Sequence, residues 1–81
     1  MSRDAGTADG ARALLASVLR IDVVELEADA AIGLTERWDS LAHMNLILAL
    51  EERLGRQLDT DTMLAIESLA DIEALLRTAA R

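Results

Sequence analysis

Apolar residues recur every three to four positions in three parts of the chain, a spacing that places them on one face of an α-helix. These parts are residues 9–20, residues 39–54 and a segment that begins at Ser68, and a shorter helical turn is expected over residues 60–66. The apolar faces of the first and last helices comprise Ala11, Leu14, Leu15, Val18, Leu19, Leu69, Ile72, Leu75 and Leu76. The pattern predicts an all-α fold, a small bundle of three main helices plus one short helix.

Residues suited to helix ends support these limits. Asp9 can cap the first helix, Gly55 can end the second in the left-handed conformation, and Ser68 opens a weak capping-box pattern at the last. Residues 1–8 are small and polar and are predicted to form a flexible tail. We therefore expect a single domain over residues 9–81.

A long loop is expected between the first two helices. Residues 27–38 show no clear period, and a loop of this length in so small a domain is usually functional. The short apolar segment 21–26 before it should pack against the core. Four apolar side chains are expected to anchor the loop, namely Leu26, Ile32, Leu34 and Trp38.

The second helix carries two apolar stripes, although a surface helix needs only one. The predicted core stripe comprises Leu46, Ile47, Leu50 and Leu54. On roughly the opposite side lie Leu41, Met44 and Leu48, bordered by Asn45, Glu51 and Glu52. An apolar stripe with acidic neighbours is typical of a partner-binding surface. The alternative is that the preceding loop folds over this stripe, above all over Leu41, and buries it.

Composition narrows the classes of function. The net charge of −7 argues against nucleic-acid binding, which needs clustered basic residues, and an acidic surface suits basic protein partners, although it can also serve solubility alone. No apolar run is long enough to span a membrane and no secretory signal is present, so a cytoplasmic location is expected. Without Cys and with a single His, the chain offers no obvious metal site, and it has few acid–base groups for an enzyme.

The candidate functional residues lie where the long loop meets the second helix. Asp39 or Ser40 could simply cap the helix. However, the segment 38–41, Trp-Asp-Ser-Leu, followed by an apolar helix that ends in Leu-Glu-Glu at 50–52, resembles the acyl carrier protein family. The resemblance covers nearly all of the chain after residue 8, and the absence of Cys, the length and the acidity agree with it.

The resemblance implies a carrier that catalyses nothing by itself. A separate phosphopantetheinyl transferase would attach phosphopantetheine from coenzyme A to the Ser40 hydroxyl in a magnesium-dependent step, and Asp39 would take part in recognition by that transferase. The arm would hold an acyl or aminoacyl group as a thioester and present it to a loading ligase and to later enzymes of a biosynthetic pathway. By family position, the residues that face these partners would be Leu41, Met44, Asn45, Leu48, Glu51 and Glu52.

Departures from the family pattern indicate a specialised pathway. Trp38 stands where primary-metabolism carriers often have Gly or an aliphatic residue, and Asn45 replaces a common acid. Peptidyl carriers usually have a Gly-rich turn with His before the serine, which Trp38 and Asp39 replace here. We therefore expect a stand-alone, monomeric carrier. The alternative from another class is an unmodified helical adaptor that uses the second stripe.

His43 lies one turn after Ser40 and, by helical angle, close to the core stripe. The favoured interpretation is a histidine at the edge of the core that hydrogen-bonds the long loop. The alternative is that it lines the mouth of a groove for the arm.

Overall fold

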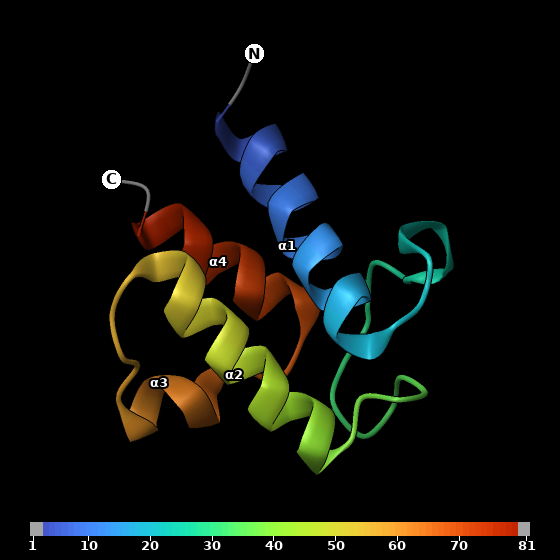
Figure 1. Cartoon of the computed structure of the whole chain (residues 1–81). Helices are drawn as coiled ribbons and strands as arrows, with labels where there is room; N and C mark the ends of the chain where they lie inside the picture. The colour runs from blue at the N-terminus through green and yellow to red at the C-terminus, as the bar shows by residue number, and fades with distance from the viewer. Residues whose placement is uncertain (1–2, 80–81) are drawn as a thin grey trace.

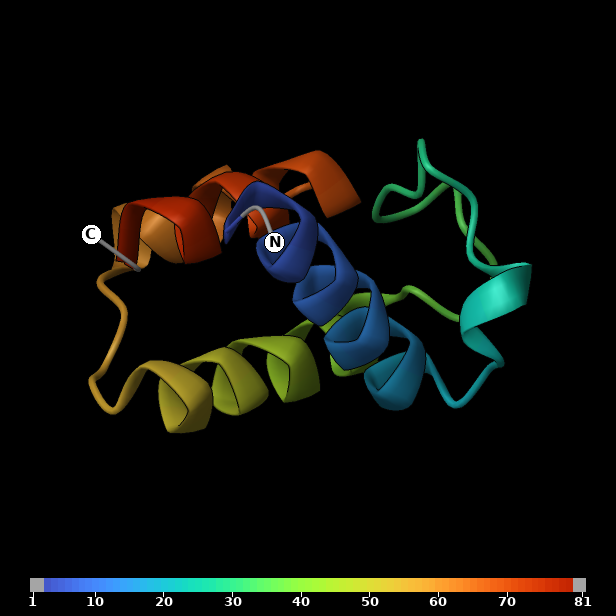
Figure 2. The same cartoon turned by 90° about the horizontal axis from the view of Figure 1, so that it is seen from above.

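The fold is a small bundle of α-helices, as predicted. The computed structural model describes residues 3–79, and side chains from residue 10 onward. Its elements in chain order are α1 (Arg3–Leu19), the 3₁₀ turn η1 (Val23–Glu25), α2 (Ser40–Leu54), α3 (Thr60–Ala65) and α4 (Leu69–Ala79) (Figure 1). Helix α1 packs against both α4 and α2, and the view from above shows it crossing between them (Figure 2). None of the described helices is long and apolar enough to cross a bilayer.

Helix α1 begins earlier than predicted. It starts at Arg3, so the expected start at Asp9 was wrong. No proline interrupts residues 3–8, and Ala5 and Ala8 favour a helix, which offsets the unfavourable Gly6. Residues 1–2 of the expected tail lie outside the described residues. The flexibility of the tail, and the division of the chain at residue 9, stay predictions.

The segment after α1 packs down only at its ends. Arg12 of α1 donates hydrogen bonds from Nη2 to the carbonyl oxygens of Leu26 (2.6 Å) and Val23 (3.3 Å), which holds η1 against the helix. Leu26 is buried, whereas Val23 and Val24 are exposed. The expectation that this whole apolar segment packs against the core was therefore wrong at the two valines, because a 3₁₀ turn points them outward.

The long loop is joined to the start of α4 by a short antiparallel bridge. The Ile32 N–H donates to the Glu67 carbonyl and the Leu69 N–H donates to the Ala30 carbonyl, each at 2.9 Å. These bonds hold the middle of the loop against the last helix.

Three of the four expected anchors of the loop face the core. Leu26 and Trp38 are buried, and Ile32 is partly buried against the core. Leu34 is 88% exposed, so its assignment as an anchor was wrong. It follows Gly33, whose φ of +81° turns the chain outward at this point.

Helix ends follow local chemistry. Gly55 takes the left-handed conformation (φ +71°) and ends α2, as predicted. At α4, the Ser68 hydroxyl accepts a hydrogen bond from the Asp71 N–H (3.2 Å). The Asp71 carboxylate in turn accepts from the Glu67 N–H (2.9 Å), one residue before the position of an ordinary capping box.

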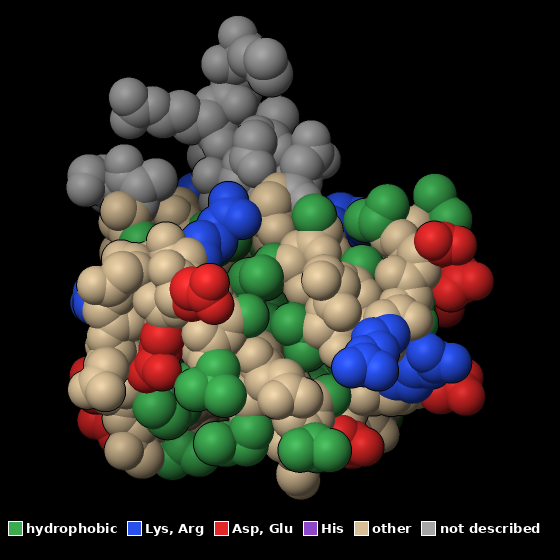
Figure 3. All heavy atoms as spheres, in the orientation of Figure 1, with side chains coloured by type: hydrophobic (Ala, Val, Ile, Leu, Met, Phe, Trp, Pro, Cys, Tyr) green, Lys and Arg blue, Asp and Glu red, His purple; other side chains and the backbone are tan. Residues whose placement is uncertain are grey.

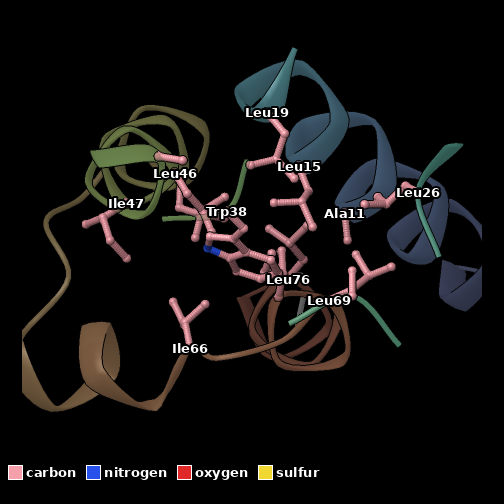
Figure 4. Packing of buried hydrophobic residues seen from close by; sticks show 14 of the residues in the cluster. Ala11, Leu15, Leu19, Leu26, Trp38, Leu46, Ile47, Ile66, Leu69 and Leu76 are labelled. Carbon is pink, nitrogen blue, oxygen red and sulfur yellow. The ribbon is translucent and has the colours of Figure 1, made fainter. Parts of the chain in front are cut away.

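The core lies where α1, α2, α4 and the long loop meet (Figure 4). Leu46, Ile47 and Leu50 of the predicted core stripe are buried, and Leu54 is half-buried against them. The largest fully buried side chains are Trp38, Leu15, Leu46, Leu50, Leu69 and Ile72. One face of α2 therefore packs in the core, and its opposite face does not contribute to that packing.

Candidate functional site at the start of α2

Asp39, not Ser40, caps helix α2. Asp39 has extended backbone, and its Oδ1 atom accepts a hydrogen bond from the Ala42 N–H at 2.9 Å. Its carbonyl accepts from the His43 N–H, also at 2.9 Å. Ser40 is the first residue of the helix and is exposed. The cap is thus provided by Asp39, and the fold does not depend on the Ser40 hydroxyl for it.

The surroundings of Ser40 suit an attached anion. The first N–H groups of a helix have no partner within the helix, and the helix dipole places partial positive charge there. Asp39 satisfies one of these groups through its side chain, while the N–H groups of Ser40 and Leu41 point out of the same end. A phosphodiester on the Ser40 oxygen would lie beside these donors. The carboxylate of Asp39 opposes this effect, because it adds a negative charge nearby.

The second stripe of α2 is exposed, so the long loop does not cover it. Leu41, Met44 and Leu48, which we call the exposed stripe, are 71%, 57% and 59% exposed. Leu64 of α3 is exposed as well. Figure 3 shows hydrophobic side chains gathering over α2 and α3 at the lower edge of the molecule, with acidic side chains beside them. Water therefore meets a series of apolar side chains that begins next to Ser40.

The polar border of the exposed stripe is not uniform. Asn45 and Glu52 are exposed. Glu51 is half-buried, and its Oε2 atom accepts a hydrogen bond from the Leu58 N–H at 2.9 Å. Glu51 therefore ties the connection after α2 to the helix, a structural contact that spacing along one helix does not reveal.

His43 joins the end of the long loop to α3. The Trp38 indole Nε1–H donates to His43 Nδ1 at 3.2 Å, and His43 Nε2 lies 3.4 Å from the Met63 carbonyl oxygen. Because Nδ1 accepts, the ring hydrogen belongs on Nε2, where it can be donated to Met63. The predicted hydrogen bond between His43 and the long loop is confirmed, with Trp38 as the donor. The link to α3 was missed, because a backbone carbonyl leaves no signal in the sequence.

Asp59 caps α3 in the same way as Asp39 caps α2. Its Oδ1 atom accepts a hydrogen bond from the Thr62 N–H at 2.7 Å. Hydrogen bonds from the side chain and the backbone N–H of Thr62 hold the pKa of the Asp59 carboxyl below its usual value, and the positive charge of Arg56 acts in the same direction.

A separate groove of about 550 Å³ lies within residues 21–37. Its walls combine the carboxylates of Glu25, Glu27, Asp29 and Glu36 with Arg37 and with the apolar side chains of Ile21 and Leu34. None of the predicted site residues line this groove. Arg37, which does line it, is the neighbour of Trp38 in the sequence.

Comparison with protein families shows to which family the chain belongs. The model of a family described as "Phosphopantetheine attachment site" matches residues 9–76 of the 81. The chain belongs to this family. A search of the curated proteins gave no match at the required significance. As a phosphopantetheine carrier, the protein bears this prosthetic group covalently. Carrier domains act with phosphopantetheinyl transferases and partner enzymes, and are not catalytic themselves.

The carrier's residues fit the prosthetic group. An exposed hydroxyl stands at the N-terminus of a helix of 15 residues, next to free N–H donors and to an exposed apolar stripe. When attached, phosphopantetheine supplies a terminal thiol that can hold cargo as a thioester.

Proposed function

We propose that Ser40 bears the phosphopantetheine arm, and that the carrier presents an acyl or aminoacyl thioester to enzymes of a specialised biosynthetic pathway. The observation that carries this proposal is the exposed place of Ser40 at the first position of α2. It lies within the matched segment, in the sequence Asp39-Ser40-Leu41. Since Asp39 already caps the helix, Ser40 is free to be modified without loss of the fold.

The attachment step uses the Ser40 hydroxyl as the nucleophile. Its oxygen forms a bond to the phosphorus that bears the pantetheine arm of coenzyme A. The bond from that phosphorus to the oxygen of adenosine 3′,5′-bisphosphate breaks, and the hydroxyl proton passes to a base of the transferase. The carrier contributes an accessible oxygen and a helix end that tolerates the resulting negative charge. Asp39 would contribute to recognition by the transferase.

The exposed stripe would form the docking surface for the transferase, the loading ligase and later enzymes. The central contacts would come from Leu41, Met44 and Leu48, and the polar contacts from Asn45, Glu51 and Glu52. Burial of apolar area supplies affinity at such a surface, while the net charge of −7 speeds the encounter with basic partners. The carrier would act as a cytoplasmic monomer.

Intact-mass measurement tests the attachment site. Wild-type protein, Ser40→Ala and the control Ser17→Ala, an exposed serine of α1, are incubated with coenzyme A and a broad-specificity phosphopantetheinyl transferase. The wild type and Ser17→Ala should gain the mass of one arm and Ser40→Ala should not, with its melting temperature nearly unchanged. A mass gain by Ser40→Ala would refute the assignment. An unmodified wild type would favour the adaptor function instead.

A further inference from the structure

Trp38 occupies the interior directly behind the proposed attachment site. It is two residues from Ser40, yet its side chain is only 1% exposed. Figure 4 shows the indole between α2 and α4, facing Leu46 on one side and Leu76 on the other. The largest side chain of the protein therefore fills the space between these two helices.

A pair of hydrogen bonds holds this side chain in place. His43 accepts from the indole N–H and reaches the Met63 carbonyl on α3, as described above. The planes of the two rings differ by 25°, and their centroids lie 6.2 Å apart, so the rings meet edge to edge through this hydrogen bond. These two hydrogen bonds link the long loop to the last turn of α3 through His43. His43 lies one turn along α2 from Ser40.

The link through His43 lies within one helical turn of Ser40 and joins α2 to α3. An apolar group tethered at the start of α2 that entered the bundle between α2 and α3 would meet these hydrogen-bonded rings. To enter, it would have to displace an indole from a close-packed interior and leave its N–H and the histidine nitrogen without partners, both of which are unfavourable. The exposed stripe and Leu64 offer it an apolar surface outside at no such cost.

We propose that Trp38, held by His43, closes the interior of the bundle to cargo, so that an acyl group carried on Ser40 stays on the outer surface. This inference rests on the proposed function of Ser40. It makes the thioester accessible to partner enzymes without a prior opening of the carrier. It also makes the carrier tolerant of cargo size, because the cargo does not have to fit a cavity.

Chain length of the cargo provides the test. The wild type and Trp38→Ala are loaded with phosphopantetheine that bears either an acetyl or a decanoyl group, and loading is checked by intact mass. Removal of the indole leaves an apolar cavity, and a cavity of about 150 Å³ in another protein binds benzene. The decanoyl form of Trp38→Ala should therefore melt about 4 °C or more above its acetyl form. The two wild-type forms should melt together.

A matched cavity and a direct probe complete the design. Leu15→Ala removes a fully buried side chain of α1, and its melting should not depend on chain length, because Trp38 still closes the interior in this variant. Trp38 is the single tryptophan and the chain has no Tyr. Its fluorescence emission should be the same in the acetyl and decanoyl forms of the wild type.

The results separate this inference from the function on which it rests. If no arm is attached to Ser40, the proposed function fails. If the arm is attached but decanoyl cargo raises the wild-type melting temperature, or gives nuclear Overhauser contacts with Leu46 and Ile47, only the closure is refuted. A Trp38→Ala protein without any dependence on chain length would refute the part assigned to Trp38. If Trp38→Ala does not fold, the wild-type contacts and Trp38 emission still decide the matter.

Discussion

Leu48 and Leu50 offer a sharp test of the two faces of α2. Both are leucines in the same helix, two positions apart, but Leu50 is fully buried and Leu48 is 59% exposed. Leu and Ala are both good helix formers, so Leu→Ala at either position leaves the helix itself little changed. Any difference between the two variants therefore reports on what each side chain contacts.

The expected magnitudes follow from burial. Leu50→Ala leaves a cavity in the core and should lower the free energy of unfolding by about 2–5 kcal/mol. In a domain of this size, 1 kcal/mol corresponds to about 4–8 °C, so the melting temperature should fall by about 8 °C or more. Leu48→Ala removes a side chain that already meets water, and its free energy of unfolding should change by about 0.5 kcal/mol or less.

Activity should show the reverse order of effects. At a temperature where both variants are folded, Leu48→Ala should lower the efficiency of loading by a transferase about fivefold, which corresponds to about 1 kcal/mol of lost contact energy. Leu50→Ala should load nearly as well as the wild type. Thermal melts followed by circular dichroism and initial loading rates measure the two quantities. If Leu48→Ala melts as early as Leu50→Ala, both stripes are core, and if it loads at the wild-type rate, the exposed stripe is not the transferase surface.

Three further predictions concern the acidic residues. Asp39→Ala should lower the free energy of unfolding by about 0.5–2 kcal/mol through loss of the cap. Asp39→Asn should retain the cap but slow loading by the transferase. Equal loading rates for Asp39→Asn and the wild type would show that the transferase does not recognise the Asp39 charge. Glu52→Lys should slow loading without a change in melting, and added salt should reduce the difference. Glu51→Lys should lower the melting temperature as well, since its carboxylate accepts a backbone hydrogen bond; identical melts for these two variants would contradict the bond. The lowered pKa of Asp59 means that its contribution to stability is present above the usual carboxyl value and is lost as pH falls through the lowered folded value. The NMR shift of the Thr62 amide should then titrate with a midpoint below 3.8, and a midpoint at or above that value would show that the cap is absent.

Much of the fold was predictable because the deciding interactions are local. The spacing of Leu46 and Leu50 predicted the core side of α2, and the left-handed preference of glycine predicted the end at Gly55. The short helix α3 was expected over residues 60–66 and is found at Thr60–Ala65. Local signals were weakest at α1, where Asp9 can cap a helix but the helix begins six residues earlier, at Arg3.

The candidate site was predictable in its residues but not in their roles. The sequence alone placed Asp39, Ser40 and the exposed stripe together, because they share one helix and its first turn. It left open which of Asp39 and Ser40 is the cap, since either side chain can accept the same backbone hydrogen bond. The structure assigns the cap to Asp39.

Only the tertiary structure decided which side chains meet across the bundle. The sequence by itself determined the helices, the core side of α2 and the chemistry available at Ser40, because helical period and helix ends depend on neighbours in the chain. It did not determine that Leu34 faces water, that Glu51 binds the Leu58 N–H, or that His43 links Trp38 to α3. The contacts of Glu51 and His43 join groups from different elements, and two of them use backbone atoms that every residue possesses. Folding alone brings such groups within hydrogen-bonding distance.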